Sequence, residues 1–166
     1  GSSCANAYLV IWFNDLSNWA NPKEIRKIGP GDTVRLCGTI STALIIRGSG
    51  SSGSPITILF EPDAKLSAPY WTANGAISAS SKNYIIIDGG SNGLIEATDS
   101  GTALGNQPSN VRGVYLNSCT NCEVKNLTVS NLYVRTLNAT DSAGSGTHLI
   151  YVSSGGNNSI HDNYLN

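Results

Sequence analysis

The chain has 166 residues, 40% of them apolar, which is enough to bury the core of one domain. Charged residues make up only 13%, the net charge is -1, and the ten Lys and Arg residues are scattered, so no nucleic-acid partner is expected. No apolar run is as long as the roughly 18 residues that a membrane-spanning helix requires. Asn, Ser, Gly and Thr are abundant, and they favour turns and β-structure over helix. We therefore expect one all-β domain over residues 1–166.

The first predicted element is a helix over residues 15–29. Residues typical of helix ends lie at both of its limits: Asn21 as N-cap, Pro22 and Glu24 in the first turn, and Gly29 after the last turn. Ile25 and Ile28 would share one face of this helix. That face could cover the open end of a stack of strands, which would begin at about residue 32.

Three later segments repeat one layout, in which two short strands flank a tight Ser/Gly/Asn turn. The segments are GAISASSKNYIIIDG (75–89), RGVYLNSCTNCEVKN (112–126) and HLIYVSSGGNNSIHDN (148–163). Their apolar anchors Ile77, Val114 and Ile150 are 37 and 36 residues apart. Each unit ends in a third short run, and variable loops over 98–110 and 132–147 separate the units. Three short strands per turn, stacked at about 4.8 Å, predict a parallel β-helix with Ile77, Val114 and Ile150 in successive coils.

Asparagines mark the corners of the predicted coils. Asn126 lies between two apolar runs, where a left-handed backbone and a bond from its amide to the next coil would allow a bend. Asn126 and Asn163, with Asp88 or Gly89 above them, are expected to form a column, in this register or in one shifted by one residue.

Four cysteines allow several interpretations. Cys119 and Cys122 form a CxxC motif, but zinc would need two more ligands and a redox pair would need a βαβ unit, and neither pattern is visible. Disulfides that join Cys119 to Cys122 and Cys4 to Cys37 are expected in an oxidising compartment, with buried free thiols as the alternative. Glycosylation sequons at Asn126, Asn138 and Asn157 give weak further support for an extracellular or cell-surface protein.

Several motifs of the chain carry a family resemblance. Its motifs are GDTVRL, GSPITI, NYIIIDG, NSCTNCEVKNLTVSN and NNSIHDNYLN, together with the predicted capping helix. Over about residues 8–166 the chain resembles the N-terminal part of right-handed parallel β-helix proteins of the pectin-lyase-like class. The resemblance implies a right-handed solenoid whose substrate lies along the outer face of one parallel sheet, beside long loops.

A substrate-binding column is predicted on that face. If the anchors point inward, alternation turns Ser78, Tyr115 and Tyr151 outward. Two tyrosines in successive coils would form a flat platform for sugar rings, and their hydroxyls could bond sugar hydroxyls. The alternatives are a register that differs by one residue, or loops that cover both rings.

Candidate catalytic residues lie at the loop edge of the same sheet. Arg112 could hold a uronate carboxylate in a bidentate fork, and His148 could transfer a proton near neutral pH. Asp99 and Asp141, from the two flanking loops, could bind Ca²⁺ or orient the histidine. The alternative is a set of solvated residues with no catalytic role.

Two functional hypotheses follow. The first is an extracellular polysaccharide lyase-like or hydrolase-like protein that acts on or binds a polysaccharide. However, the chain lacks the NTD, DD, GHG and RIK motifs of polygalacturonase-like hydrolases and the dense Asp site of pectate lyases. The second is a non-catalytic structural, adhesive or filament subunit, which could be glycosylated. The final motif IHDNYLN stops inside a predicted coil, so we expect either further coils or docking onto another chain there.

Overall fold

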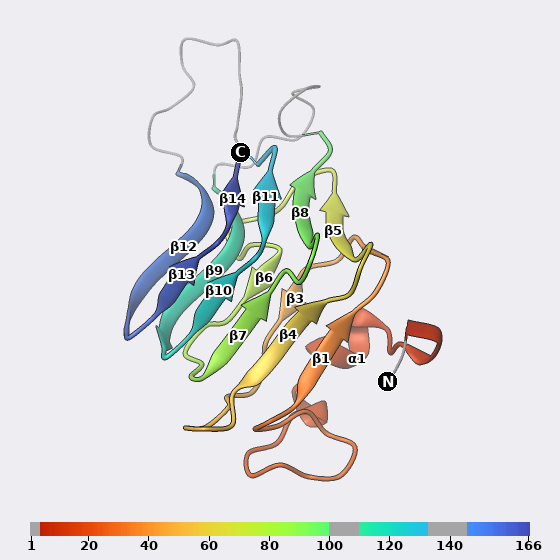
Figure 1. Cartoon of the computed structure of the whole chain (residues 1–166), viewed down its shortest axis with the longest axis vertical. Helices are drawn as coiled ribbons and strands as arrows, with labels where there is room; N and C mark the ends of the chain where they lie inside the picture. The colour runs from red at the N-terminus through yellow and green to blue at the C-terminus, as the bar shows by residue number, and fades with distance from the viewer. Residues whose placement is uncertain (1–3, 100–109, 133–145) are drawn as a thin grey trace.

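The structure is a computed structural model that describes residues 4–99, 110–132 and 146–166. Short strands stack side by side along one axis, with a small helical segment near the N-terminus (Figure 1). The elements in chain order are η1 (Cys4–Asn6), α1 (Val10–Asn14), η2 (Leu16–Asn18), β1 (Thr33–Leu36), β2 (Thr39–Ile40), β3 (Leu44–Ile45), β4 (Ile56–Phe60), β5 (Lys65–Ala68), β6 (Ile77–Ser78), β7 (Ile85–Asp88), β8 (Leu94–Ala97), β9 (Val111–Thr120), β10 (Glu123–Lys125), β11 (Thr128–Ser130), β12 (Thr147–Gly156), β13 (Ser159–His161) and β14 (Tyr164–Leu165).

These strands form three sheets, and every strand pair in them is parallel. The sheet orders are β1-β4-β7-β10-β13, β2-β5-β8-β11-β14 and β3-β6-β9-β12. Consecutive strands therefore belong to different sheets, and each turn of the chain adds one strand to each sheet. The predicted right-handed parallel β-helix with three short strands per coil is confirmed.

The core is a set of columns of apolar side chains inside the solenoid. Ile58 pairs with Ile87, and Ile87 pairs with Val124 in the next coil. All three side chains have no exposed surface. In β4 and β7 the residues alternate between buried and partly exposed, as expected for strands with one face on the core. Each such side chain stabilises the fold by about 1.5–3 kcal/mol.

The predicted stacking across the long loops is also confirmed. Ile77 pairs with Val114, and Val114 pairs with Ile150. Ile77 and Val114 are fully buried, and Ile150 packs against the core. The variable loops therefore lengthen the chain between coils without changing the register of the sheet.

The corner at Asn126 has the backbone that the sequence indicated. Asn126 has a φ of 55°, and its Nδ2 donates to Oδ1 of Asp88 in the preceding coil at 3.0 Å. In the following coil the same left-handed conformation occurs at Asp162, with a φ of 54°. The register of β10 and β13 aligns Asn126 with Asp162, so the column follows the alternative register, shifted by one residue, and does not pass through Asn163.

Asn163 instead bridges two coils through both ends of its amide. Its Oδ1 accepts from the backbone N–H of Leu127 at 3.0 Å, and its Nδ2 donates to the carbonyl of Val124 at 2.9 Å. Asn158 makes an equivalent pair of bonds to the turn at residues 119–122. An amide carries both a donor and an acceptor, so one side chain satisfies two backbone groups where a strand ends.

The prediction of a helix over 15–29 was wrong. The described helix is α1 (Val10–Asn14), and the segment after it contains only the single turn η2 (Leu16–Asn18). Trp19 forms a parallel bridge with Ile28, and both side chains are buried. A helix would hold these residues about 13 Å apart, so their joint burial outweighs the local capping signals. Ile25, predicted to share the covering face, is 91% exposed.

Asn14 protects the free edge of the sheet at β3. Its Oδ1 accepts from the N–H of Ile45 at 2.8 Å, and its Nδ2 donates to the carbonyl of Ala43 at 2.9 Å. These bonds replace those that a neighbouring strand would make, and covering an edge in this way prevents pairing with another chain. The N-terminal segment over residues 4–29, hereafter called the cap, therefore protects strand edges as well as apolar side chains.

Both predicted disulfides are present, and they have different roles. Cys4 bonds to Cys37 and ties the N-terminal segment to the end of β1. Cys119 bonds to Cys122 and closes the turn between β9 and β10. The described residues contain no helix of the length and apolarity that a membrane crossing requires.

Charged side chains form a cluster on the outer face of β7, β10 and β13. Lys125 Nζ lies 2.9 Å from Glu123 Oε1 and 4.0 Å from Asp88 Oδ2. His161 contacts Glu123 through Nε2 at 3.0 Å and Asp162 through Nδ1 at 2.8 Å. Two hydrogen bonds raise the pKa of His161 above its ordinary value of 6.5. The bond to Asp162 has the larger effect, and the bond to Glu123 has the smaller one. The hydrogen bond from Lys125 is the main cause that lowers the pKa of Glu123.

This cluster predicts a pH dependence of stability. The folded-state pKa of His161 is raised, so its contribution is fully present below the unfolded pKa of about 6.5 and is lost as the pH rises through the folded pKa. We expect wild type to be more stable than His161→Asn at acidic pH and this difference to shrink at alkaline pH. Urea unfolding of both proteins at about pH 5.5 and 8.5 measures it, and about 1 M salt should weaken it because the cluster is exposed. A difference that is the same at both pH values would contradict the assignment.

Candidate functional site

The predicted substrate column lies on the sheet β3-β6-β9-β12, with its residues in register. Ser78 pairs with Tyr115, and Tyr115 pairs with Tyr151. Both tyrosines are partly exposed, whereas Ser78 is only 7% exposed. The surface that a ligand could reach is therefore formed by the two tyrosines of β9 and β12 rather than by all three residues.

The two tyrosine rings do not form the bare flat platform that the alternation predicted. Their centroids are 5.6 Å apart, and the ring planes are tilted by 37°. The guanidinium Cζ of Arg112 lies 4.5 Å from the centroid of Tyr115 and 4.3 Å from that of Tyr151. A guanidinium in this position interacts favourably with the π-electrons of both rings. The three side chains therefore form one cationic and aromatic unit.

Arg112 and Tyr115 share a face because the strand alternation breaks between them. Gly113 and Val114 are both buried, while Arg112 and Tyr115 are partly exposed. An ideal strand would place residues three apart on opposite faces. A Cβ at Gly113 would come within 2.5 Å of the carbonyl oxygen of Leu149, so glycine permits the close approach of the next coil at this irregularity.

The loop that precedes β6 holds Arg112 through two hydrogen bonds. Its backbone N–H donates to the carbonyl of Thr72 at 3.3 Å, and its guanidinium Nη1 donates to the carbonyl of Ala73. His148 pairs with Arg112 across the β9–β12 register, and its ring meets the ring of Tyr151 edge-on at 4.5 Å. The cluster of Arg112, Tyr115, His148 and Tyr151 is hereafter called the Arg–Tyr cluster.

Two polar atoms of the Arg–Tyr cluster are buried without a hydrogen-bond partner in the described part of the chain. They are Nε of Arg112 and Nδ1 of His148. An unsatisfied buried polar atom costs about 1–3 kcal/mol, so such pairs are uncommon unless a ligand or water completes them. Both atoms belong to residues that are paired across adjacent strands.

Of the two predicted calcium ligands, the structure describes Asp99. The backbone N–H of Asp99 donates to the carbonyl of Pro69, which places Asp99 at the same corner as the segment that holds Arg112. Asp141 lies outside the described residues. Within the described ranges, no group of three or more His, Cys, Asp or Glu side chains could hold a metal ion.

The sequons differ in their surroundings. Asn157 is exposed, at the turn between β12 and β13. Asn126 is also exposed, but its amide nitrogen donates to Asp88. Asn138 lies outside the described residues. Glycosylation at any of these positions stays a prediction.

The fold and the cluster together define a class of protein. It is a parallel β-helix with a cationic and aromatic cluster on the outer face of one sheet. Comparisons with protein-family models, with curated proteins and with solved structures found no match. The Arg–Tyr cluster is therefore the feature of the molecule from which a function can be inferred.

Sequence reasoning found the members of this cluster but missed how they interact. The sequence pattern places Arg112 and His148 at the loop edge and predicts a separate platform of two tyrosines. The stacking of Arg112 on both rings depends on the irregularity at Gly113. A glycine next to an arginine in an otherwise alternating strand was the available signal, because glycine in a strand often marks a bulge.

Proposed function

We propose that this chain is an extracellular β-helix protein of the pectin-lyase-like kind that binds an acidic polysaccharide over the Arg–Tyr cluster. The observation that carries the proposal is the pair of unsatisfied buried atoms, Nε of Arg112 and Nδ1 of His148, beside two tyrosine rings. The disulfides are compatible with secretion.

The chemistry of the cluster suits a uronate residue. The Nε–H of Arg112 is a charged donor, and it would bind a carboxylate oxygen more strongly than a neutral hydroxyl. The edges of the tyrosine rings would contact the apolar faces of sugar rings, and their hydroxyls would bond sugar hydroxyls. A neutral polysaccharide would make the ring contacts but would leave the cationic donor without an anionic partner.

Cleavage by a lyase-like or hydrolase-like reaction is a further part of the proposal. His148 is the candidate for proton transfer, since imidazole can both accept and donate a proton near neutral pH. Unsaturated products, followed by absorbance, and new reducing ends on a panel of acidic polysaccharides are the measurements. His148→Gln should abolish either signal even at saturating polysaccharide, and it should also weaken binding because the ligand loses its bond to Nδ1 of His148. Binding without either signal from wild type would restrict the proposal to recognition.

Variants that make the same change in net charge at two different positions test the binding proposal. We expect Arg112→Gln to weaken binding of polygalacturonate at least about tenfold, because the ligand loses a charged hydrogen bond. Arg112→Lys keeps the charge but loses the planar donor group, so an intermediate affinity is expected. Arg35→Gln makes the same change on the outer face of another sheet and should stay within about twofold.

Affinity electrophoresis with polygalacturonate and with a neutral glucan measures these values, and circular dichroism verifies that each variant is folded. Equal losses in Arg112→Gln and Arg35→Gln would reduce the effect to net charge and would contradict the proposed site. Equal affinity of wild type for both polysaccharides would also contradict it.

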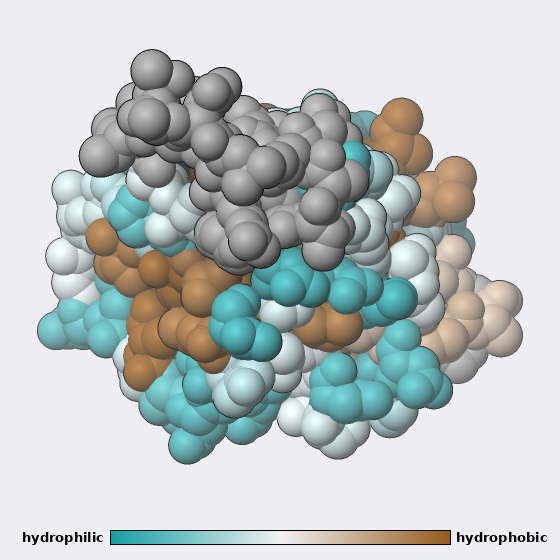
Figure 2. All heavy atoms as spheres, turned by 90° about the horizontal axis from the view of Figure 1, so that it is seen from above, coloured by the Kyte–Doolittle hydropathy of each residue, from teal (hydrophilic) through white to brown (hydrophobic). Residues whose placement is uncertain are grey.

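The second candidate is a non-catalytic structural or adhesive subunit. It is supported by exposed apolar side chains in the last described coil, at Val152, Ile160, Tyr164 and Leu165. Figure 2 shows apolar surface on the side where Figure 1 places β12 and β13. Such a surface could associate with another protein. Sedimentation of the isolated protein tests this function, and uniform monomers at high concentration would count against a filament.

A further inference from the structure

The sequence did not predict a cavity at the N-terminal end of the solenoid, yet the structure contains one there. It has a volume of about 290 Å³ and lies between the N-terminal segment and the first coil. This volume is close to the lower end of the roughly 300–1,000 Å³ of small-molecule sites. The cavity lies at the opposite end of the stack from β12, so it is separate from the Arg–Tyr cluster.

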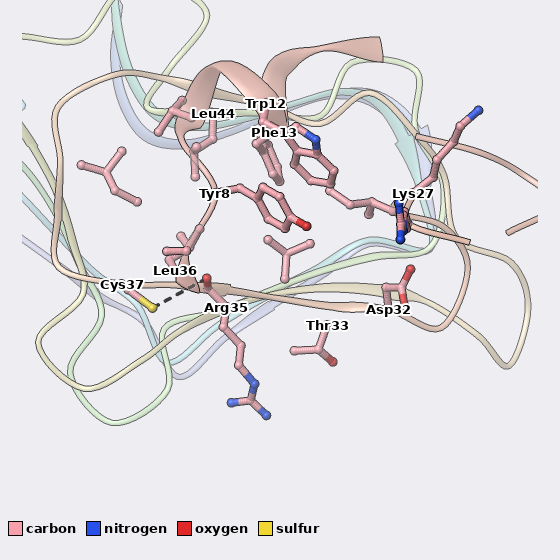
Figure 3. A pocket seen from close by; sticks show the side chains of 16 residues that line it. Tyr8, Trp12, Phe13, Lys27, Asp32, Thr33, Arg35, Leu36, Cys37 and Leu44 are labelled. Atoms are coloured by element: carbon pink, nitrogen blue, oxygen red, sulfur yellow. Dashed lines mark hydrogen bonds between the residues drawn. The ribbon is translucent and has the colours of Figure 1, made fainter. Parts of the chain in front are cut away.

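The interior of this cavity is aromatic and aliphatic. Tyr8 and Trp12 stack with ring centroids 4.2 Å apart and ring planes inclined by 17°. Their rings lie over β1, whose Val34 and Leu36 contribute to the lining (Figure 3). A ligand with a small apolar body would remove this surface from water, which stabilises the complex by about 25 cal/mol for each Å² of apolar area.

Charged residues around the cavity are mostly engaged with other partners. Lys27 forms an ion pair with Glu24 at 2.8 Å. Asp32 is paired with Lys23 and, through Oδ2, accepts from the N–H of Gly29. These groups are therefore already neutralised locally.

Two arginines complete the charged lining, and they differ. Arg35 is paired with Glu61, and Figure 3 shows its side chain pointing away from the cavity. Arg26 is exposed and has no ion pair or hydrogen bond to any described residue. The cavity is therefore an apolar space with one available cation at its boundary.

We propose that this cavity binds a compact amphipathic monocarboxylate, with its apolar body against Tyr8 and Trp12 and its carboxylate at Arg26. The size of the space limits the ligand to a small molecule. The unpaired cation selects an anion over a neutral or cationic compound of the same length. This site is independent of the polysaccharide site proposed above.

Three eight-carbon probes separate the apolar contribution from the charge. Octanoate, 1-octanol and octylammonium share one chain and differ only in the head group. We expect calorimetric titration of wild type to show octanoate about fivefold tighter than 1-octanol, and octylammonium weakest. The backbone amide NMR signals of Ile28, Val34 and Leu36 should shift on binding, whereas those of Ile160 and Leu165 should not.

Variants then assign the two parts of the site. Arg26→Gln should remove the preference for octanoate and leave 1-octanol unchanged, while Lys82→Gln, which removes a cation elsewhere, should keep the preference. Ala7→Trp fills the cavity from an exposed position and should weaken all three probes. The proposal is overturned if wild type does not bind octanoate, if Arg26→Gln keeps the preference, or if the shifts map to the last coil.

Discussion

The Gly89→Ala variant is expected to lose about 3 kcal/mol of unfolding free energy, one of the two largest effects predicted for this protein. Gly89 follows β7, at the corner where the chain turns toward β8. A Cβ there would lie 1.9 Å from the carbonyl oxygen of Asn126 and 2.8 Å from the Cα of Leu127. Both atoms are backbone of the next coil, so neither can rotate away. Adjacent coils would have to separate beyond the strand spacing of about 4.8 Å.

Gly156 provides the matched control. A Cβ at Gly156 would meet no heavy atom within 4 Å, and its backbone φ is not positive. We expect Gly156→Ala to stay within about 0.5 kcal/mol of wild type. Urea unfolding followed by tryptophan fluorescence compares the variants. Equal stability of Gly89→Ala and wild type would show that the coils do not approach so closely at this corner.

The second large effect concerns two neighbouring isoleucines of β7. Ile87 is fully buried between Ile58 and Val124, whereas Ile86 is partly exposed on the outer face. Ile87→Ala removes buried methyl groups and leaves a cavity in the column, so we expect a loss of about 3 kcal/mol. Ile86→Ala makes the same chemical change on the outer face and should cost about 1 kcal/mol or less.

The comparison of these two variants tests the register directly. A shift of the strand by one residue would exchange the two faces of β7. Chemical unfolding in identical buffers gives the two differences in unfolding free energy. The data are fitted with one common dependence of the free energy on denaturant concentration. Equal losses, or a larger loss for Ile86→Ala, would contradict the assignment of the core columns.

The coil architecture was predictable because its signal repeats. Anchors at Ile77, Val114 and Ile150 recur at nearly constant separation, and the structure places them in neighbouring strands of one sheet. Polar residues with a tolerance for positive φ, such as Asn126, mark the bends. Alternation within each short strand then determines which residues face the core.

The cap could not be predicted in the same way because its signal occurs once. Asn21, Pro22 and Glu24 have the composition of a helix start, but the segment instead joins Trp19 to Ile28. The helix that does form, α1, has no side-chain hydrogen bond at its N-cap and carries Phe13 into the core. Local propensity is a weak term, and the burial of Phe13 and Trp19, whose rings meet edge-on at 5.0 Å, exceeds it.

For the candidate site, the repeat and the strand alternation predict the column of Ser78, Tyr115 and Tyr151 and the alignment of Arg112 with His148, because both patterns can be read along the chain. Three features are apparent only in the folded molecule: Arg112 covers both tyrosine rings, Ser78 is buried, and the N-terminal segment leaves a cavity. These features depend on how closely coils and cap approach one another. Contacts between residues distant in the chain set that approach, and no short stretch of sequence encodes them.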